Sequence, residues 1–587
     1  MAISMIKLQT LNLKKLIRVS EVDVILFSLA FTFVFFTTRY QLNATREFYF
    51  WDNAGYHNIV LQMMDRLHSA PKLDFFRDLY HSFSDEISNL FAVPLLPFME
   101  LFGESRFIFI LSMAFCYLLP TVFLTAWFCS RLVDSHRRLT FWVTTFLLLL
   151  SPFCWMSILD GRPDIGGSGL ILLALSLQIF ASSEKKNGEK KGRWAYPVIA
   201  FLLGISLLFR RHFMLVLPPY LLAAVFFEWM RLGFSPPGAR TFSENKKEML
   251  VRLFILGGSL GLFLCALGYP FIAHYFDPKL YGIYASYKAD PIHGSGVVTE
   301  YFLSFFSIPI WILSLLGLRG LVRETQMELK NKLPIYWVMG FAILWVLTWI
   351  GFGHARHNYI VTIFWIFPIG IVGLVAWGLS AFSPENRSRI TVTLLLVIGV
   401  VNALCLFNIG SFPKYFFPKS VVPLVRKDYP EIIRLIGDLQ TMTGPKSPIL
   451  VAGSSWILNE GVLSDAETQF VGRKNRRLNI LGILHADSYK QIPIKAIMVA
   501  EWAIVPTPFQ WHIRPDVQQC IQVLHDAFMD HWEISQDFEM LPQEYLLNDG
   551  VIVKIFHRIK STSPEVEQLT LVRMKNRILK TNIQNNT

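Results

Sequence analysis

Long apolar runs recur through the first 400 residues of this chain, and they constrain its fold more than any motif does. A membrane-spanning helix needs about 20 mainly apolar residues, and runs of roughly 15 to 24 residues are read as spans. Eleven such runs cover residues 24–38, 107–128, 139–159, 165–181, 195–209, 213–230, 253–276, 301–318, 334–352, 360–380 and 390–406. Hydrophobic residues make up 53% of the chain and charged residues 17%, and the mean hydropathy is +0.41. The sequence therefore predicts an α-helical polytopic membrane protein.

Basic residues gather before the first run and then in alternate loops, which predicts an orientation. Lys- and Arg-rich short loops stay on the cytoplasmic side of a membrane. The basic segments are residues 7–18, 131–138, 185–193, 231–252, 319–332 and 387–389. We therefore expect the N-terminus inside and, after eleven spans, the C-terminal region outside. The net charge of +12 then reflects topology and needs no nucleic-acid partner. The first run has no convincing small-residue cleavage site, which favours a retained helix over a signal peptide.

The same reading divides the chain into three parts. Residues 1–409 form the membrane domain, whose first outer loop (39–105) is too long for a simple connector. Apolar residues recur at helical spacing over 58–67, as in a helix that lies along the membrane surface. Residues 410–560 alternate helical patterns (429–441, 515–532) with strand-like runs (448–452, 496–505, 550–556), which predicts a small outer α/β domain. Residues 561–587 are polar, and we expect a flexible tail.

The segment Trp51–His57 places an acid, Asp52, about a dozen residues past the first apolar span. An ionisable group at a membrane boundary is a functional candidate, and partial desolvation raises the pKa of a carboxyl toward the range that suits a general base. The alternative is that Asp52 caps the helix that follows.

Several motifs together resemble one enzyme family. Asp52 is followed by Asn53 and, four residues after the acid, by Tyr56. Further motifs are Phe91–Phe98 with its two prolines, Leu101–Arg106, Gly204–Arg211, Arg356–Tyr359 and Phe367–Pro368. Their order and spacing resemble the GT-C superfamily of membrane glycosyltransferases, in particular the branch of the protein O-mannosyltransferases and the bacterial lipid A aminoarabinose transferase. The chain departs from this pattern at Asn53, where the family has a second acid, and it lacks the basic residue before the paired prolines.

The resemblance implies a hexosyl or pentosyl transferase in a bacterial inner (plasma) membrane, with its active site facing the periplasm. Such an enzyme moves a sugar from a polyprenyl-phosphate donor to a lipid, glycan or protein acceptor, with inversion at the anomeric carbon. Asp52 would be the catalytic base. The predicted substrate-binding residues are Tyr56, His57, Asp160, Arg162, Asp164, Arg210, Arg211, Arg356, His357 and Tyr359. Arginine suits the phosphate because its planar fork donates to two oxygens at once.

Each of these residues also has a plainer interpretation. Arg210 and Arg211 could extend from the membrane to the interface, and Asp160 or Asp164 could pair with Arg162 inside one turn. Asp52 with Asp160 or Asp164 could hold a divalent cation, although arginines can do the same work. His354 and His357 lack a nearby carboxylate, and the six cysteines show neither metal nor disulfide spacing. The turn Gly453–Ser455 could bind an anion or be an ordinary turn.

Two other function classes stay open at this point. A lipid transporter or flippase would also have many spans, but it usually shows repeat symmetry and charged groups at the bilayer midplane, which this sequence lacks. A catalytically inactive relative that serves as an envelope scaffold would explain Asn53 and the missing basic residue.

Overall fold

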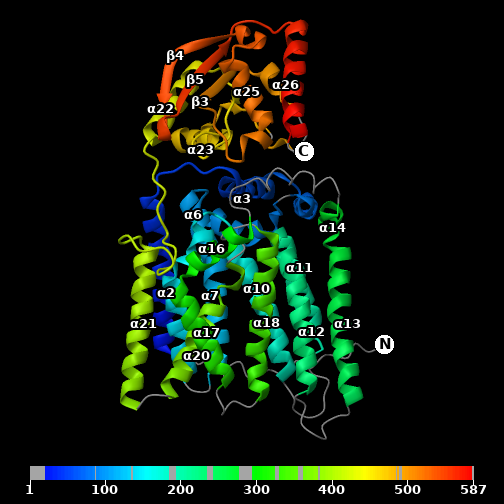
Figure 1. Ribbon diagram of the computed structural model, residues 1–587, viewed down its shortest axis with the longest axis vertical. Coiled ribbons are helices and arrows are strands. Elements are labelled where there is room, and N and C mark those ends of the chain that lie inside the picture. Colours follow the sequence, from blue (N-terminus) through cyan, green and yellow to red (C-terminus); the bar gives the residue numbers. More distant parts are fainter. Residues whose placement is uncertain are drawn as a thin grey trace.

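The computed structural model describes residues 20–85, 87–133, 136–183, 193–233, 242–276, 294–323, 329–353, 361–380, 384–483, 485–487 and 492–584. A bundle of long helices forms its lower part and a smaller domain with a sheet lies above it (Figure 1). Helix α3 (Trp51–Ser69) lies across the top of the bundle, between the two parts.

The lower part contains sixteen α-helices besides α3 and α4 (Lys72–His81) within the described residues. They are α2 (Glu21–Ala44), α5 (Leu96–Phe102), α6 (Arg106–Met113), α7 (Leu119–Arg131), α8 (Arg137–Leu150), α9 (Pro152–Leu159), α10 (Asp164–Ser183), α11 (Ala195–Phe209), α12 (Leu217–Gly233), α13 (Phe242–Ala266), α14 (Tyr269–Tyr275), α16 (Ser295–Phe306), α17 (Ile308–Arg323), α18 (Leu329–Phe352) and α20 (Ile366–Ser380), followed by α21 (Pro384–Leu406) as the last helix of the bundle. Short helical turns η2 (Asn89–Leu95) and η4 (Arg211–Val216) precede α5 and α12.

Six of these helical segments in the described chain are long and apolar enough to cross a membrane, or up to eight if each bent pair is one span. The bent pairs are α8 with α9, at 54°, and α16 with α17, at 82°. Three of the eleven predicted runs, 165–181, 195–209 and 360–380, coincide with shorter apolar helices. The chain is thus a mostly helical protein of the membrane type, as its composition indicates.

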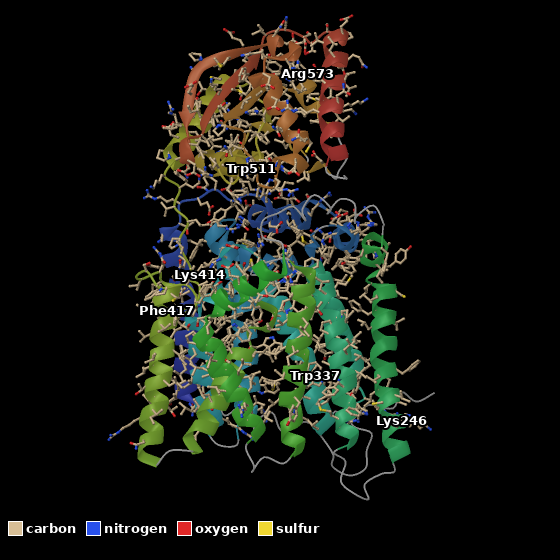
Figure 2. All side chains as sticks on the ribbon, viewed as in Figure 1. Lys246, Trp337, Lys414, Phe417, Trp511 and Arg573 are labelled. Atoms are coloured by element: carbon tan, nitrogen blue, oxygen red, sulfur yellow. The ribbon has the colours of Figure 1, made fainter. Side chains whose placement is uncertain are left out.

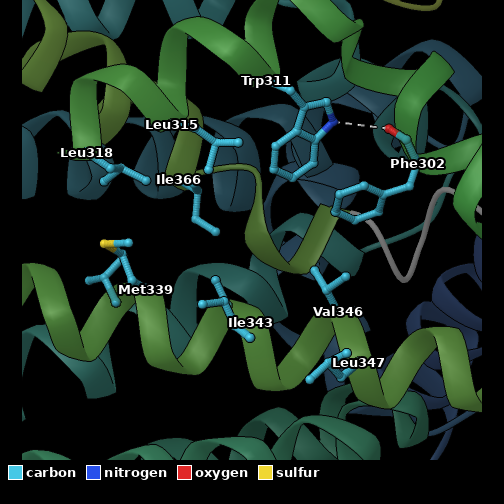
Figure 3. Close-up of a pocket in the computed structure, with 11 residues that line it drawn as sticks. Phe302, Trp311, Leu315, Leu318, Met339, Ile343, Val346, Leu347 and Ile366 are labelled. Carbon is cyan, nitrogen blue, oxygen red and sulfur yellow. Dashed lines mark hydrogen bonds between the residues drawn. The ribbon is translucent and has the colours of Figure 1, made fainter.

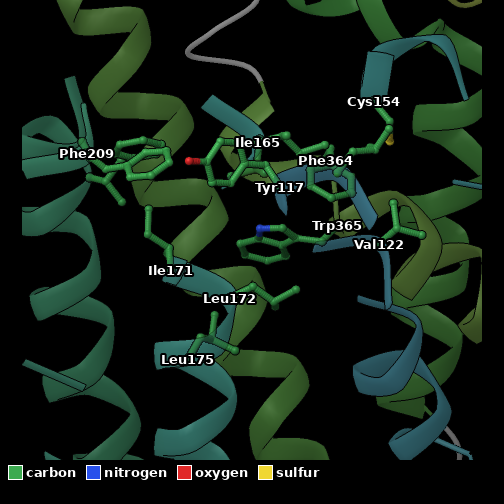
Figure 4. Close-up of a cluster of buried hydrophobic side chains, with 14 of the residues drawn as sticks. Tyr117, Val122, Cys154, Ile165, Ile171, Leu172, Leu175, Phe209, Phe364 and Trp365 are labelled. Carbon is green, nitrogen blue, oxygen red and sulfur yellow. The ribbon is translucent and has the colours of Figure 1, made fainter. Parts of the chain in front are cut away.

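The bundle packs around large aromatic and aliphatic side chains. Tyr117, Ile165, Phe209 and Trp365 come from different segments of the bundle and meet in one buried cluster (Figure 4). Helices α17 and α20 cross closely at Gly317 and Gly370. There is no room for a side chain there, since a Cβ added at Gly317 would lie 1.7 Å from the carbonyl oxygen of Gly370. Small residues at such crossings are typical of helices that pack within a membrane.

The upper part is an α/β domain with a five-stranded sheet of order β2-β1-β3-β5-β4. Its strands are β1 (Pro448–Val451), β2 (Asn479–Ile480), β3 (Trp502–Thr507), β4 (Phe538–Leu546) and β5 (Ile552–Arg558), and its helices are α22 (Tyr429–Met442), α23 (Glu460–Val471), α24 (Ile494–Val499), α25 (Gln519–Met529) and α26 (Pro564–Gln584). Strand β1 pairs in parallel with β2 and β3, whereas β5 is antiparallel to β3 and β4.

Two local predictions for this domain were wrong. The expected strand 496–505 is divided into helix α24 and strand β3, because Ile497 turns into the core one helical turn before the sheet begins. The expected flexible tail contains helix α26, which packs on the domain. Thr570, Met574 and Ile578 recur every four residues and form a narrow buried stripe, and Arg577 contacts Asp526 at 2.6 Å. Such a stripe docks a helix that is otherwise polar.

Candidate functional site

Three chain segments meet at the outer end of the bundle, beneath the upper domain. They are the first turn of α3, the turn between α9 and α10 (160–164), and the turn between α11 and η4. Charged side chains gather there because each segment lies at a helix end on the outer side of the bundle.

Helix α3 begins earlier than the apolar pattern suggests, so that Asp52 lies in its first turn. Phe50 is the residue before the helix and makes no side-chain capping bond, so Asp52 is not the cap. An acid in the first turn is favourable beside the free N–H groups of a helix. The buried face of α3 contains Tyr56, Val60 and Met63, which fixes Asp52 against the bundle.

Asp52 is held at the edge of the site and remains accessible. Its carboxylate lies 3.7 Å from Nη2 of Arg162, and 42% of its side chain is exposed. Asn53 fills the position of the expected second acid. Its side-chain oxygen accepts from Arg162 Nη2 (3.3 Å), and its backbone carbonyl accepts from Arg106 Nη1 (2.7 Å). Two guanidinium groups therefore fix the start of α3.

Asp164 lies deeper in the site, fully buried. Its carboxylate is 3.0 Å from Nε of Arg210 and 3.8 Å from Nδ1 of His212. The guanidinium of Arg210 also lies over the ring of Tyr56, 5.0 Å from its centroid. Asp164 and Arg210 thus form a buried ion pair on the inner side of the site.

The turn that carries these residues requires glycine at position 161. Gly161 has a φ of +82°, and a Cβ there would lie 2.7 Å from Nη2 of Arg106. Only glycine combines this backbone conformation with so close an approach of a side chain.

Several buried polar atoms around the site have no hydrogen-bond partner in the described part of the chain. They include Nε1 of Trp51, Oη of Tyr56, and Nε and Nη2 of Arg106. Buried polar atoms are usually satisfied. Trp51 and Arg106 are partly exposed, so their N–H groups suit contact with a polar ligand, whereas Tyr56 is fully buried.

Two further predicted site residues, His57 and Arg211, lie on the same segments. The ring of His57 stacks on Phe109, with centroids 4.7 Å apart, and its Nε2 lies 3.0 Å from the Glu104 carbonyl. Burial lowers the pKa of His57 to about 3, which keeps the ring neutral. Arg211 is partly exposed at the start of η4, and it is the neighbouring Arg210 that reaches Asp164.

The remaining predicted residues are only partly described. Asp160 ends helix α9, at the entrance of the turn. Arg356, His357 and Tyr359 lie outside the described residues.

Sequence reasoning missed two charged groups near the site, Glu47 and Lys419. Burial raises the pKa of Glu47 to about 7, although Arg426 opposes the shift, and Asp160 adds to it. Burial also lowers the pKa of Lys419, and the charge of Asp160 opposes this. Glu47 lies five residues before Asp52 and could have been noticed there. Lys419 is far away in sequence, and only the fold brings it to this end of the bundle.

No group of three or more His, Cys, Asp or Glu side chains in the described ranges is arranged to hold a metal ion. Asp52 and Asp164 each face a guanidinium instead.

An apolar cavity of about 250 Å³ lies between α16, α17, α18 and α20 (Figure 3). Phe302, Trp311 and Val338 are among the side chains that line it. Leu315, Ile343 and Leu347, which also line it, are more than half exposed on the outside of the bundle. The cavity therefore opens sideways, toward the region that lipid would occupy.

No protein-family model and no curated protein matches the chain. Among solved structures it is similar to ArnT from Cupriavidus metallidurans, both apo (12% identity, TM-score 0.48, 91% of this chain and 97% of that one) and bound to undecaprenyl phosphate (13%, 0.48, 92% and 99%). It is also similar to the oligosaccharyltransferase AglB from Archaeoglobus fulgidus in complex with an inhibitory peptide and a dolichol-phosphate (10%, 0.42, 89% and 74%).

Proposed function

We propose that this chain is a GT-C type glycosyltransferase that moves a sugar from a polyprenyl-phosphate donor to an acceptor outside the cytoplasm. One observation carries the proposal: an accessible carboxylate, Asp52, lies beside Arg162, with the buried pair of Asp164 and Arg210 behind it. An acid that an acceptor can reach, surrounded by fixed cations, is what transfer from a phosphate requires.

In the proposed reaction Asp52 accepts the proton of an acceptor hydroxyl as that oxygen attacks the anomeric carbon. The bond between sugar and phosphate breaks, its electron pair remains on the phosphate oxygen, and the configuration inverts. Asp164 is fully buried beside Arg210, so it is not accessible to an acceptor. We assign it to positioning Arg210.

The leaving phosphate needs cationic donors. Arg106 and Arg210 are our first candidates, because the former has unsatisfied N–H groups and the latter is held in place by Asp164. Arg211, Arg356 and Lys419 are further candidates. Arginines aimed at developing charge stabilise it without reorganisation.

The apolar cavity in Figure 3 suits the isoprenoid chain of the donor, since its lining is apolar and it opens toward lipid. The upper domain, above the site, would help select a lipid, glycan or protein acceptor. We place the enzyme in a bacterial inner membrane with its site facing the periplasm.

The proposal is tested by mass spectrometry of envelope lipids and glycoproteins from a deletion strain. We expect one polyprenyl-phosphate sugar to accumulate and one acceptor to lose that sugar, with both changes reversed by the wild-type gene. A scaffold or a flippase would not produce this pair of changes. An unchanged set of sugar-modified acceptors would contradict the proposal.

A further inference from the structure

The residue before Asp52 has a strained backbone. Trp51 has a φ of +47°, in the left-handed region, although its side chain is large. Bulky residues rarely adopt this conformation, and it persists only where the surroundings enforce it. Whatever holds Trp51 therefore also determines where Asp52 lies.

The ring of Trp51 is held mainly by the upper domain. Its centroid lies 4.4 Å from that of His512 and 5.2 Å from that of Trp456. Phe50, on the same segment, completes the contact at 5.0 Å. Aromatic pairs at such distances attract each other beyond the area that they bury.

Backbone contacts fix the same segment to helix α23. The N–H of Tyr49 donates to Asp465 at 2.8 Å. A Cβ added at Gly461 would lie 2.7 Å from Cβ of Phe50, so helix α23 and the segment before α3 are in direct contact.

His512 is itself held by a chain of polar side chains inside the upper domain. Its Nδ1 lies 3.0 Å from Oγ of Ser454, and that hydroxyl lies 2.7 Å from Nδ1 of His485. Nε2 of His485 lies 2.8 Å from Glu460, which leaves Nδ1 to accept the Ser454 proton. Ser454 is fully buried, so this trio cannot act on a substrate as a nucleophile would. It serves as a rigid support for the ring of His512.

We propose that the upper domain positions the catalytic base, by holding the strained Trp51 between His512 and Trp456. This inference rests on the proposed function and adds a positioning role for Trp51 and His512. The upper domain is then part of the active site, because Asp52 is correctly aimed only while the domain is docked.

The test is a double-mutant cycle on the turnover number, with the variants Trp51→Ala, His512→Ala and their combination. We expect each single change to lower kcat by about 10- to 100-fold, since small misplacements of a catalytic group have effects of this size, and to leave the KM for the donor nearly unchanged. Residues that act as a unit are not additive. The double variant should therefore be no slower than the slower single variant.

The matched control is Trp511→Ala, since Trp511 is next to His512 in sequence and its ring is 48% exposed at the lower edge of the upper domain (Figure 2). We expect wild-type kcat for it. Trp51→Phe keeps an aromatic ring and should have a kcat between those of Trp51→Ala and the wild type. If Trp51→Ala does not fold, Trp51→Phe replaces it in the double-mutant cycle with His512→Ala.

Wild-type kcat in Trp51→Ala, or additive effects in the double variant, would overturn the positioning role. Asp52→Asn is assayed in parallel. Full transfer by Asp52→Asn would instead refute the proposed base, so the two failures are distinguishable.

Discussion

At the scale of single residues, the site contains two carboxylates with opposite surroundings. Asp52 is 42% exposed and 3.7 Å from Arg162, whereas Asp164 is fully buried and 3.0 Å from Arg210. Removing one partner of a buried ion pair leaves an uncompensated charge, at a cost of about 3 to 5 kcal/mol. We expect Asp164→Ala to lower the thermal unfolding temperature clearly and Asp52→Ala to leave it almost unchanged, as measured in detergent. Equal shifts for the two variants would contradict the distinction between them.

Glu47 should make stability depend on pH. Its pKa is about 7 in the folded protein and ordinarily 4.5, so the folded state binds more protons between these values. Stability then falls as pH rises from 4.5 to 7, by about 3 kcal/mol in total, and changes little through this group above pH 7. In Glu47→Gln, which cannot ionise at this position, the stability should no longer show this fall between pH 4.5 and pH 7. The measurement is the unfolding temperature of both proteins at pH 5 and pH 8, and parallel curves would rule the effect out.

The sequence predicted part of the candidate site because helix ends are visible in it. Arg162, Asp164 and Arg210 lie next to the ends of apolar runs, Asp52 lies in the outer loop after the first run, and the fold brings these positions together. The sequence did not reveal the role of Trp51. Its conformation depends on Trp456 and His512, more than 400 positions away, and no local pattern encodes that contact.

At the scale of elements, helix α26 shows how a polar segment becomes part of a domain. Met574 is fully buried in the cluster around β3 and α25, while Leu569 on the same helix is 55% exposed. Truncating a buried methionine leaves a cavity and costs about 2 to 5 kcal/mol. We expect Met574→Ala to destabilise the upper domain by that amount and Leu569→Ala by less than about 0.5 kcal/mol, measured by chemical denaturation. The account of α26 fails if the two variants behave alike.

Elements could be predicted where the hydrophobic pattern was long. Runs of 20 residues allow few structures besides a membrane helix. The short run 496–505 carried no such information, because α24 and β3 are both short apolar segments that pack on β1. Strand β4 was missed because it is an edge strand with mostly exposed residues.

At the scale of the whole molecule, one arginine links the upper domain to the bundle. Arg473 contacts Asp65 on α3 and, at 3.1 Å, Glu104. Exposed ion pairs contribute about 0 to 1 kcal/mol each and weaken with salt. We expect Arg473→Ala to accelerate proteolysis of the linker 407–428 at low salt, with the difference from wild type shrinking at high salt.

The control for this prediction is Arg434→Ala, whose ion pair with Glu431 lies within helix α22 of the upper domain. It should leave the proteolysis rate unchanged. A similar acceleration in both variants would show that domain docking does not depend on Arg473.

The most direct measurement of the central claim is sugar transfer by Asp52→Asn in membranes supplied with the native polyprenyl-phosphate donor. Asparagine keeps the size of the side chain and cannot accept the proton. We expect transfer to fall by about 100-fold or more, in the range that general bases contribute. Asp74→Asn, with an acid of similar exposure in the same outer loop, should transfer normally. Full transfer by Asp52→Asn would contradict the account.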